Sequence, residues 1–349
     1  MRDRFLRACR RAPVDRTPLW IMRQAGRYLP EYRALKDRAD FLTVCKTPEL
    51  AVEASLQPLR RFELDASIIF SDIMLPLEAL GAQLTFDPGP KVAVPIRTRA
   101  AVTGMVRRPV EEAVPFVGDA IRLLRRELDD RVPVIGFCGA PFTLAAYLVE
   151  GEGRGGGFHA VKEMLFREPA TLSALLERLS DLMADYLRLQ IDAGAQAVQL
   201  FDSWAGILGV EDYRAFALPA ARAVIEKIAP LGVPVIYFLN AGPHLVELAG
   251  TSGADVLGLC WRVPLDEAWQ RTGGRMALQG NLDPHALFAP VEEVRERAHA
   301  VLGQMSGRNG HIMNLGHGIM PGTPIAGVEA LIAAVQEWPV RQPAEMRTS

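Results

Sequence analysis

Two arginines lie four positions apart, just after the apolar run PLWIM near the N-terminus. Between Arg23 and Arg27 stand Gln24, Ala25 and Gly26, and the last two carry almost no side chain. A guanidinium is permanently charged and binds a carboxylate through two parallel hydrogen bonds. The stretch is therefore either a solvated turn or a clamp for a ligand that carries several negative charges.

Four more side chains with useful chemistry accompany other apolar runs. Asp72 follows ASIIF, Ser203 follows AVQLF and His317 follows HIMNL, while Tyr147 lies in the helical pattern after VPVIGF. An ionised carboxylate offers about four acceptor sites, and hydroxyl groups can bond an anionic ligand. Plainer interpretations exist: Asp72 and the pair Asp202-Ser203 could cap helices, and Tyr147 could be a core ring with a solvated hydroxyl.

His317 stands between Gly316 and Gly318, and glycines on both sides suggest that the backbone approaches a ligand closely. The other histidines show no metal-ligand spacing. The motifs HExxH, GxSxG and GxGxxG are absent, and the glycine-rich stretch EGEGRGGGF lacks the lysine of a phosphate loop. We therefore expect no metal site and no nucleotide site.

The four cysteines are Cys9, Cys45, Cys138 and Cys260, and they form no CxxC pair or Cys/His cluster. This spacing argues against structural zinc and against a disulfide framework. We expect each thiol to be a small buried side chain, in a protein of the reducing cytoplasm.

The elements that must position these residues can be read from hydrophobic patterning. Short apolar runs rich in β-branched residues recur at 18–22, 66–70, 132–137, 197–201, 233–238, 255–259, 276–279 and 311–315. Continuous rather than alternating apolar character is typical of parallel strands buried on both faces. Eight such strands that alternate with helices predict an α/β fold, the (β/α)8 TIM barrel.

The chain is predicted to be one domain, 1–349, with its core at about 16–338 and a polar C-terminal tail at 339–349. Residues 82–96 predict a short extended excursion between strands two and three. Helices are predicted over 159–194, with Gly194 as the stop, and over 210–232 and 290–307. A further helix over 323–338 should begin with Thr323 as cap and Pro324 in the first turn.

In such a barrel, catalytic groups lie just beyond the C-terminal ends of the strands. The polar residues singled out above all follow predicted strands on that side. The sequence therefore predicts one shared site at the barrel mouth.

Composition excludes several classes of protein. The 39 basic and 41 acidic residues give a net charge of -2, so no basic field for nucleic acid is present. No stretch reaches the roughly 20 apolar residues of a membrane span. The positively charged N-terminus lacks a following apolar region, so we expect neither a secretory signal nor a membrane partner.

Long motifs resemble a known family. PLWIMRQAGR, GFCGAPFTLAAYLVEG, FDSWAG, QGNLDP and NLGHGIMP are similar to those of the uroporphyrinogen decarboxylase family, in its order and spacing from about Pro18 onward. Two positions depart from the family pattern: Cys260 stands where an aspartate is expected, and Met313 where a phenylalanine is expected.

The resemblance implies a cyclic tetrapyrrole substrate with four acetates and four propionates. The acetates of uroporphyrinogen III would be lost as CO2, giving coproporphyrinogen III, with no cofactor or metal and in a homodimer. Transferred position by position, the catalytic residues are Asp72, Arg23 and Tyr147. The substrate-binding residues are Arg23, Gln24, Ala25, Gly26, Arg27, Asp72, Tyr147, Ser203 and His317.

Two alternatives remain at this point. Corrinoid-dependent methyltransferases share the barrel, but they would call for His and Cys ligands to zinc at the strand ends. A tetrapyrrole carrier could have kept the pocket and lost turnover.

Overall fold

The computed structural model of the chain describes residues 3–86, 89–152 and 157–339. Part of the predicted turn around Asp87, part of the glycine-rich stretch and nearly all of the polar tail lie outside these ranges. Within them, no helix is long and apolar enough to cross a membrane.

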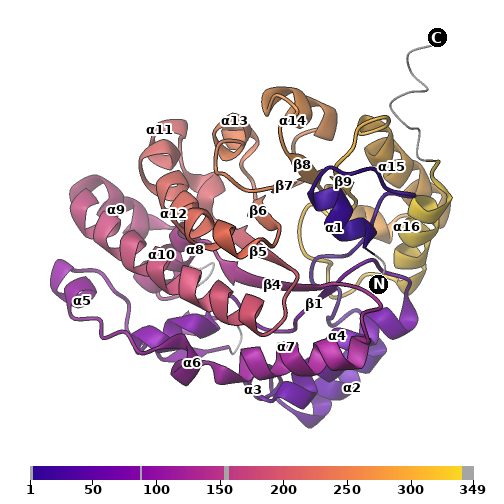
Figure 1. Cartoon of the computed structure of the whole chain (residues 1–349). Helices are drawn as coiled ribbons and strands as arrows, with labels where there is room; N and C mark the ends of the chain where they lie inside the picture. Colours follow the sequence, from indigo (N-terminus) through magenta and orange to yellow (C-terminus); the bar gives the residue numbers. More distant parts are fainter. Residues whose placement is uncertain (1–2, 87–88, 153–156, 340–349) are drawn as a thin grey trace.

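A curled parallel sheet forms the centre of the molecule, with helices outside it (Figure 1). Apart from β2 and β3, which form a separate pair, the strands pair in chain order within this sheet, β1-β4-β5-β6-β7-β8-β9. These strands are β1 (Ser67–Ile68), β4 (Val134–Gly139), β5 (Ala197–Asp202), β6 (Val235–Leu239), β7 (Val256–Leu259), β8 (Ala277–Gln279) and β9 (His311–Ile312). Every residue of β4 and of β6 is buried, which explains their continuous apolar runs.

The predicted first strand, 18–22, is not a regular strand. Leu19 forms only an isolated parallel bridge with Met313, although the segment does occupy the place between β9 and β1. The Pro18 carbonyl accepts a hydrogen bond from the Met313 N–H at 2.8 Å, and the Leu19 carbonyl accepts one from the Asp65 N–H at 2.8 Å. The segment thus closes the barrel without joining a continuous ladder.

Side chains explain why the ladder fails there. Proline has no N–H to donate, and the N–H of Leu19 goes to the Asp65 carboxylate at 2.9 Å. The Met22 N–H goes to Asn314 Oδ1 at 2.9 Å. These donors are satisfied by side chains instead of by neighbouring strands, so the apolar run alone could not predict the pairing.

Helices surround the sheet (Figure 1). The α-helices of the described residues are α1 (Arg4–Cys9), α2 (Pro30–Arg38), α3 (Phe41–Lys46), α4 (Pro48–Arg61), α5 (Arg99–Thr103), α6 (Val110–Ala113), α7 (Pro115–Leu128), α8 (Pro141–Glu150), α9 (His159–Arg167), α10 (Pro169–Asp192), α11 (Val210–Asp212), α12 (Leu218–Ile228), α13 (Val246–Ala249), α14 (Leu265–Arg271), α15 (Val291–Gln304) and α16 (Ile325–Glu337).

Several predicted helix boundaries need correction. The helix predicted over 159–194 is two helices, α9 and α10, because Pro169 cannot continue α9 but suits the first turn of α10. The helix predicted over 210–232 is divided by a π-helical turn at Tyr213–Ala217. The N-cap of α16 is Pro324, and no side chain caps it, so the cap predicted at Thr323 is wrong.

Other local predictions are confirmed. Gly194 follows the end of α10 with φ of 113°, a conformation that glycine adopts readily. The excursion at 82–96 contains an antiparallel pair, β2 (Leu84–Thr85) and β3 (Lys91–Val92). All four cysteines are described, free and buried.

Candidate active site

The predicted site residues lie beyond the C-terminal ends of the parallel strands. Asp72 follows β1, Ser203 follows β5, His317 follows β9, and Arg23 follows the segment that closes the barrel. Tyr147 lies on α8, the helix after β4. Because the carboxyl ends of parallel strands meet at the same end of a barrel, these residues share its mouth.

Arg23 is held in an uncommon backbone conformation and packs against the loop after β9. Its φ is 63°, in the left-handed region that residues other than glycine rarely adopt. A Cβ placed on Gly318 would lie only 2.3 Å from the Cδ of Arg23. Gly318 therefore leaves room for the stem of Arg23, and this contact joins two loops of the mouth.

The other residues of the stretch RQAGR (23–27) differ in burial and in role. Gln24 is buried, and its side chain accepts from the Ile21 N–H at 3.2 Å and donates to the Ala66 carbonyl at 3.2 Å. The Gln24 side chain thus ties the loop to the approach of β1. Arg27 is exposed, and Ala25 and Gly26 are partly buried.

Asp72 both caps a turn and lies at the barrel mouth. Its Oδ1 accepts a hydrogen bond from the Met74 N–H at 2.8 Å, which is a turn-capping contact. Burial raises the pKa of Asp72 to about 6, while the Met74 hydrogen bond and the charge of Arg23 act to lower it. The carboxylate is therefore ionised at neutral pH, although its surroundings disfavour the charge.

Tyr147 and Ser203 lie on the same side of the mouth. The ring of Tyr147 meets that of Trp204 edge to face, with centroids 6.0 Å apart. The carbonyl of Ser203 accepts from Asn240 Nδ2 at 3.1 Å. The Nε1 of Trp204 and the Oδ1 of Asn240 are buried and have no hydrogen-bond partner among the described residues. This part of the wall thus contains one buried donor and one buried acceptor that no described residue bonds.

The glycines beside His317 are closely packed against other parts of the protein. A Cβ on Gly316 would lie 2.4 Å from the Trp261 backbone nitrogen, and one on Gly318 would meet Arg23. The loop therefore packs closely against the protein itself, and not only toward a ligand. His317 also lies against Phe238, with ring centroids 6.4 Å apart.

A row of aromatic rings crosses the strand ends and leads to His317. Phe137 on β4 meets Phe201 on β5 at 5.5 Å between centroids, and Phe201 meets Phe238 on β6 at 5.8 Å. An apolar wall of this kind excludes water and strengthens electrostatic interactions beside it. Sequence reasoning did not select these rings, because each also reads as an ordinary core residue of a strand.

Two asparagines inside the quoted motifs hold the loops of the mouth. Asn281 donates from Nδ2 to the carbonyls of Cys260 and Val263, at 2.9 and 2.7 Å. Asn314 Oδ1 accepts from the Met22 and Leu315 N–H groups, at 2.9 and 2.8 Å. Neither was predicted, and only their position just after a strand could have indicated them.

A buried hydrogen-bond network lies next to Ser203, and it was not predicted from the sequence. Asp202 accepts one hydrogen bond from Thr143 and one from Tyr237. Burial raises the pKa of Asp202 to about 6, although both hydroxyl donors favour its charged form. The spacing of Thr143 and Tyr147, four residues apart in a helix, is the signal that could have found it.

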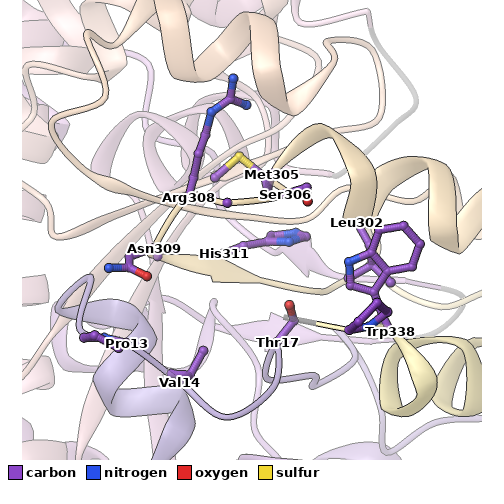
Figure 2. Close-up of a pocket in the computed structure, with 13 residues that line it drawn as sticks. Pro13, Val14, Thr17, Leu302, Met305, Ser306, Arg308, Asn309, His311 and Trp338 are labelled. Carbon is purple, nitrogen blue, oxygen red and sulfur yellow. The ribbon is translucent and has the colours of Figure 1, made fainter. Parts of the chain in front are cut away.

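In residues 3–86, 89–152 and 157–339, no three His, Cys, Asp or Glu side chains are grouped so as to hold a metal. A small pocket of about 50 Å³ lies at the opposite end of the barrel, near His311 at the start of β9 (Figure 2). His311 is buried there and bonds the Gly280 carbonyl at 3.1 Å, and burial lowers its pKa to about 4.

Comparison with known proteins shows the family of the chain. A family model described as uroporphyrinogen decarboxylase (URO-D) matches residues 1–338. The chain belongs to the uroporphyrinogen decarboxylase family. A uroporphyrinogen decarboxylase from Sorangium cellulosum is 50% identical over 341 residues, which cover 97% of each chain. One from Chloroflexus aurantiacus is 51% identical over 349 residues, again 97% of each chain.

Family membership confirms the predicted family and the predicted class of enzyme, a carboxy-lyase. The predicted fold agrees with a solved methyltransferase from Methanosarcina mazei, which has a TM-score of 0.81 at 20% identity and covers 96% of this chain and 98% of its own. At that identity the likeness concerns the fold alone. The two departures from the family pattern, Cys260 and Met313, are both buried side chains.

Proposed function

We propose that this member of the uroporphyrinogen decarboxylase family decarboxylates the four acetate side chains of uroporphyrinogen III at the barrel mouth without a cofactor. The observation that supports this most directly is that Asp72 lies close enough to Arg23 at the barrel mouth to feel its charge. A carboxylate in partly buried surroundings lies near a guanidinium at the end of the barrel where substrates bind. One ligand that carries both N–H groups and carboxylates would use both.

The substrate can supply its own electron sink. Protonation of a pyrrole ring carbon makes a cationic ring, which accepts the electron pair of the breaking C–C bond as CO2 leaves. Protonation of the exocyclic carbon then gives the methyl group, and loss of the added proton from the ring carbon restores the neutral pyrrole. Two protons are added to carbon, one is lost from the ring, and the acetate is released as neutral CO2, so charge and atoms balance.

Asp72 can bind and stabilise the reacting ring. The inward-pointing pyrrole N–H groups need an acceptor, and an ionised carboxylate has about four acceptor sites. The negative charge of Asp72 also faces the positive charge that develops on whichever ring is protonated. Fixed charges aimed at developing charge are commonly the largest catalytic term.

The other residues bind carboxylates in this proposal. Arg23 and Arg27 hold acetate or propionate groups, and Arg23 is a candidate proton donor. Tyr147 and Ser203 hydrogen-bond the reacting acetate, and His317 binds a propionate. The small side chains of Ala25 and Gly26, beside the supporting Gln24, leave room for the macrocycle. A homodimer and a cytoplasmic location remain part of the proposal.

Activity and the role of Asp72 can be tested together. The purified protein is incubated anaerobically with uroporphyrinogen III, and the products are separated by chromatography. We expect hepta-, hexa- and pentacarboxylate intermediates that end in coproporphyrinogen. Asp72→Asn should lower kcat by a factor on the order of 10²–10³, because the neutral amide loses the charge that stabilises the cation.

Asp119→Asn, an exposed carboxylate on α7, is the matched control and should retain wild-type activity. Unchanged substrate with the wild-type protein would contradict the proposal and favour a tetrapyrrole carrier. Wild-type turnover by Asp72→Asn would contradict only the role of Asp72.

A further inference from the structure

A chain of buried hydrogen bonds connects the end of β5 to the helix that carries Tyr147. Asp202 is fully buried, and both of its carboxylate oxygens are used. Oδ1 accepts from the Thr143 hydroxyl at 2.7 Å, and Oδ2 accepts from the Tyr237 hydroxyl at 2.7 Å. Tyr237 is in turn 3.1 Å from the hydroxyl of Tyr213.

Thr143 is the link between the strand and the helix. Its hydroxyl donates to Asp202 and also accepts from the Trp204 N–H at 3.1 Å. Thr143 and Tyr147 are four residues apart on α8, so they lie on the same face of that helix. The Tyr147 ring also packs on Trp204, so Tyr147 is tied to the β5 loop by two routes.

Ser203 does not depend on this link to the same degree. It follows directly from β5, which is paired on both sides with β4 and β6. Its carbonyl is also bonded by Asn240. Loss of the Thr143 hydroxyl would therefore leave Ser203 in place and remove one of the two routes that tie Tyr147 to the β5 loop.

We propose that Asp202 is a positioning residue, which acts through Thr143 to fix Tyr147 at the correct distance from Ser203. This inference rests on the proposed function, in which Tyr147 and Ser203 hydrogen-bond the reacting acetate. A misplacement of about 1 Å can cost on the order of 100-fold in rate, so a rigid connection between the two hydroxyls has a catalytic value.

The direct test is Thr143→Val, which keeps the size of the side chain and removes its hydroxyl. We expect kcat to fall by about tenfold or more while KM stays within about twofold, because the arginines still bind the substrate. Thr143→Ser keeps the hydroxyl and should restore most of kcat. Thr272→Val is the matched control: Thr272 is equally buried, and its hydroxyl bonds the Ala268 carbonyl near the C-terminal end of α14.

A double-mutant cycle separates positioning from a general structural effect. If Thr143 acts through Tyr147, Thr143→Val should cost less than about twofold in a Tyr147→Phe background, because the hydroxyl that it positions is already gone. An equal cost in the two backgrounds would overturn the inference.

Tyr147→Phe alone reports on the proposed function. Wild-type kcat in that variant would refute the role of Tyr147, and the inference with it. A low kcat in Tyr147→Phe combined with additive behaviour would refute the positioning role alone.

Discussion

The chemistry of the site depends most on one residue, Asp72, whose surroundings work against its charge. Burial raises its pKa to about 6, so the carboxylate is only moderately more stable than the acid near neutral pH. A more solvated carboxylate would stay charged at lower pH, but its charge would be screened from the substrate by water. The partly buried position thus favours strong interaction with a developing cation.

This environment predicts the pH dependence of the free enzyme. Protonation of Asp72 removes the negative charge, so kcat/KM should fall as the pH drops through about 6, by about tenfold per unit once the acid form dominates. The measurement is a pH profile of kcat/KM from pH 5 to pH 8. His317→Asn should keep this limb, because it leaves Asp72 unchanged; loss of the limb in that variant would assign the titration to His317 instead.

At the scale of elements, the mouth is built by loops that pack on each other through glycines. Gly318 accommodates the stem of Arg23, and Gly316 accommodates the backbone of Trp261. The two contacts differ in kind, because an arginine stem can move and a backbone cannot. Change at Gly318 should therefore affect function more than stability.

Gly318→Ala places a methyl group where Arg23 now lies, 2.3 Å from its Cδ. We expect the guanidinium to be displaced and kcat/KM to fall by about tenfold, which corresponds to about 1.4 kcal/mol of transition-state stabilisation. The melting temperature should change little. Steady-state kinetics with uroporphyrinogen III and a thermal melt test both statements.

The control for this substitution is Gly303→Ala in α15, where a Cβ meets no atom within 4 Å. It should stabilise the helix by roughly 0.5–1 kcal/mol and leave kinetics unchanged. Wild-type kcat/KM in Gly318→Ala would show that the position of Arg23 is not important for catalysis.

At the scale of the whole molecule, closure of the barrel depends on buried charge as well as on strand pairing. The carboxylate of Asp65 is almost fully buried. It binds Arg4 Nη1 at 2.7 Å, Arg16 Nη2 at 3.2 Å and the Leu19 N–H at 2.9 Å. The side chain of Asp65, just before β1, therefore connects α1 with the segment at 16–22 that closes the barrel.

Asp65→Ala leaves two partly buried guanidiniums without this partner, so we expect a loss of about 3–5 kcal/mol in the free energy of unfolding. Asp15→Ala is the matched control, because Asp15 binds the same Arg4 from an exposed position. Its cost should be at most about 1 kcal/mol. Urea denaturation of the three proteins gives the comparison, and equal losses in the two variants would contradict the central role of Asp65.

The fold class, the position of the candidate site and the family could all be predicted from the sequence alone. The continuous apolar runs indicated parallel strands buried on both faces, and polar residues after those runs indicated one site at the barrel mouth. Both inferences depend on local periodicity and on a general property of barrels, so they required no knowledge of individual contacts. The long motifs then identified the family.

Tertiary structure decided what local pattern could not. The run at 18–22 looked like a strand, but Asp65 and Asn314, distant in sequence, take two of its N–H groups. Likewise the local pattern around Asp202 predicts only a helix cap, and the folded chain adds Thr143 and Tyr237 as its partners. Local propensity reports which groups need partners, whereas the identity of those partners is settled only when distant segments pack together.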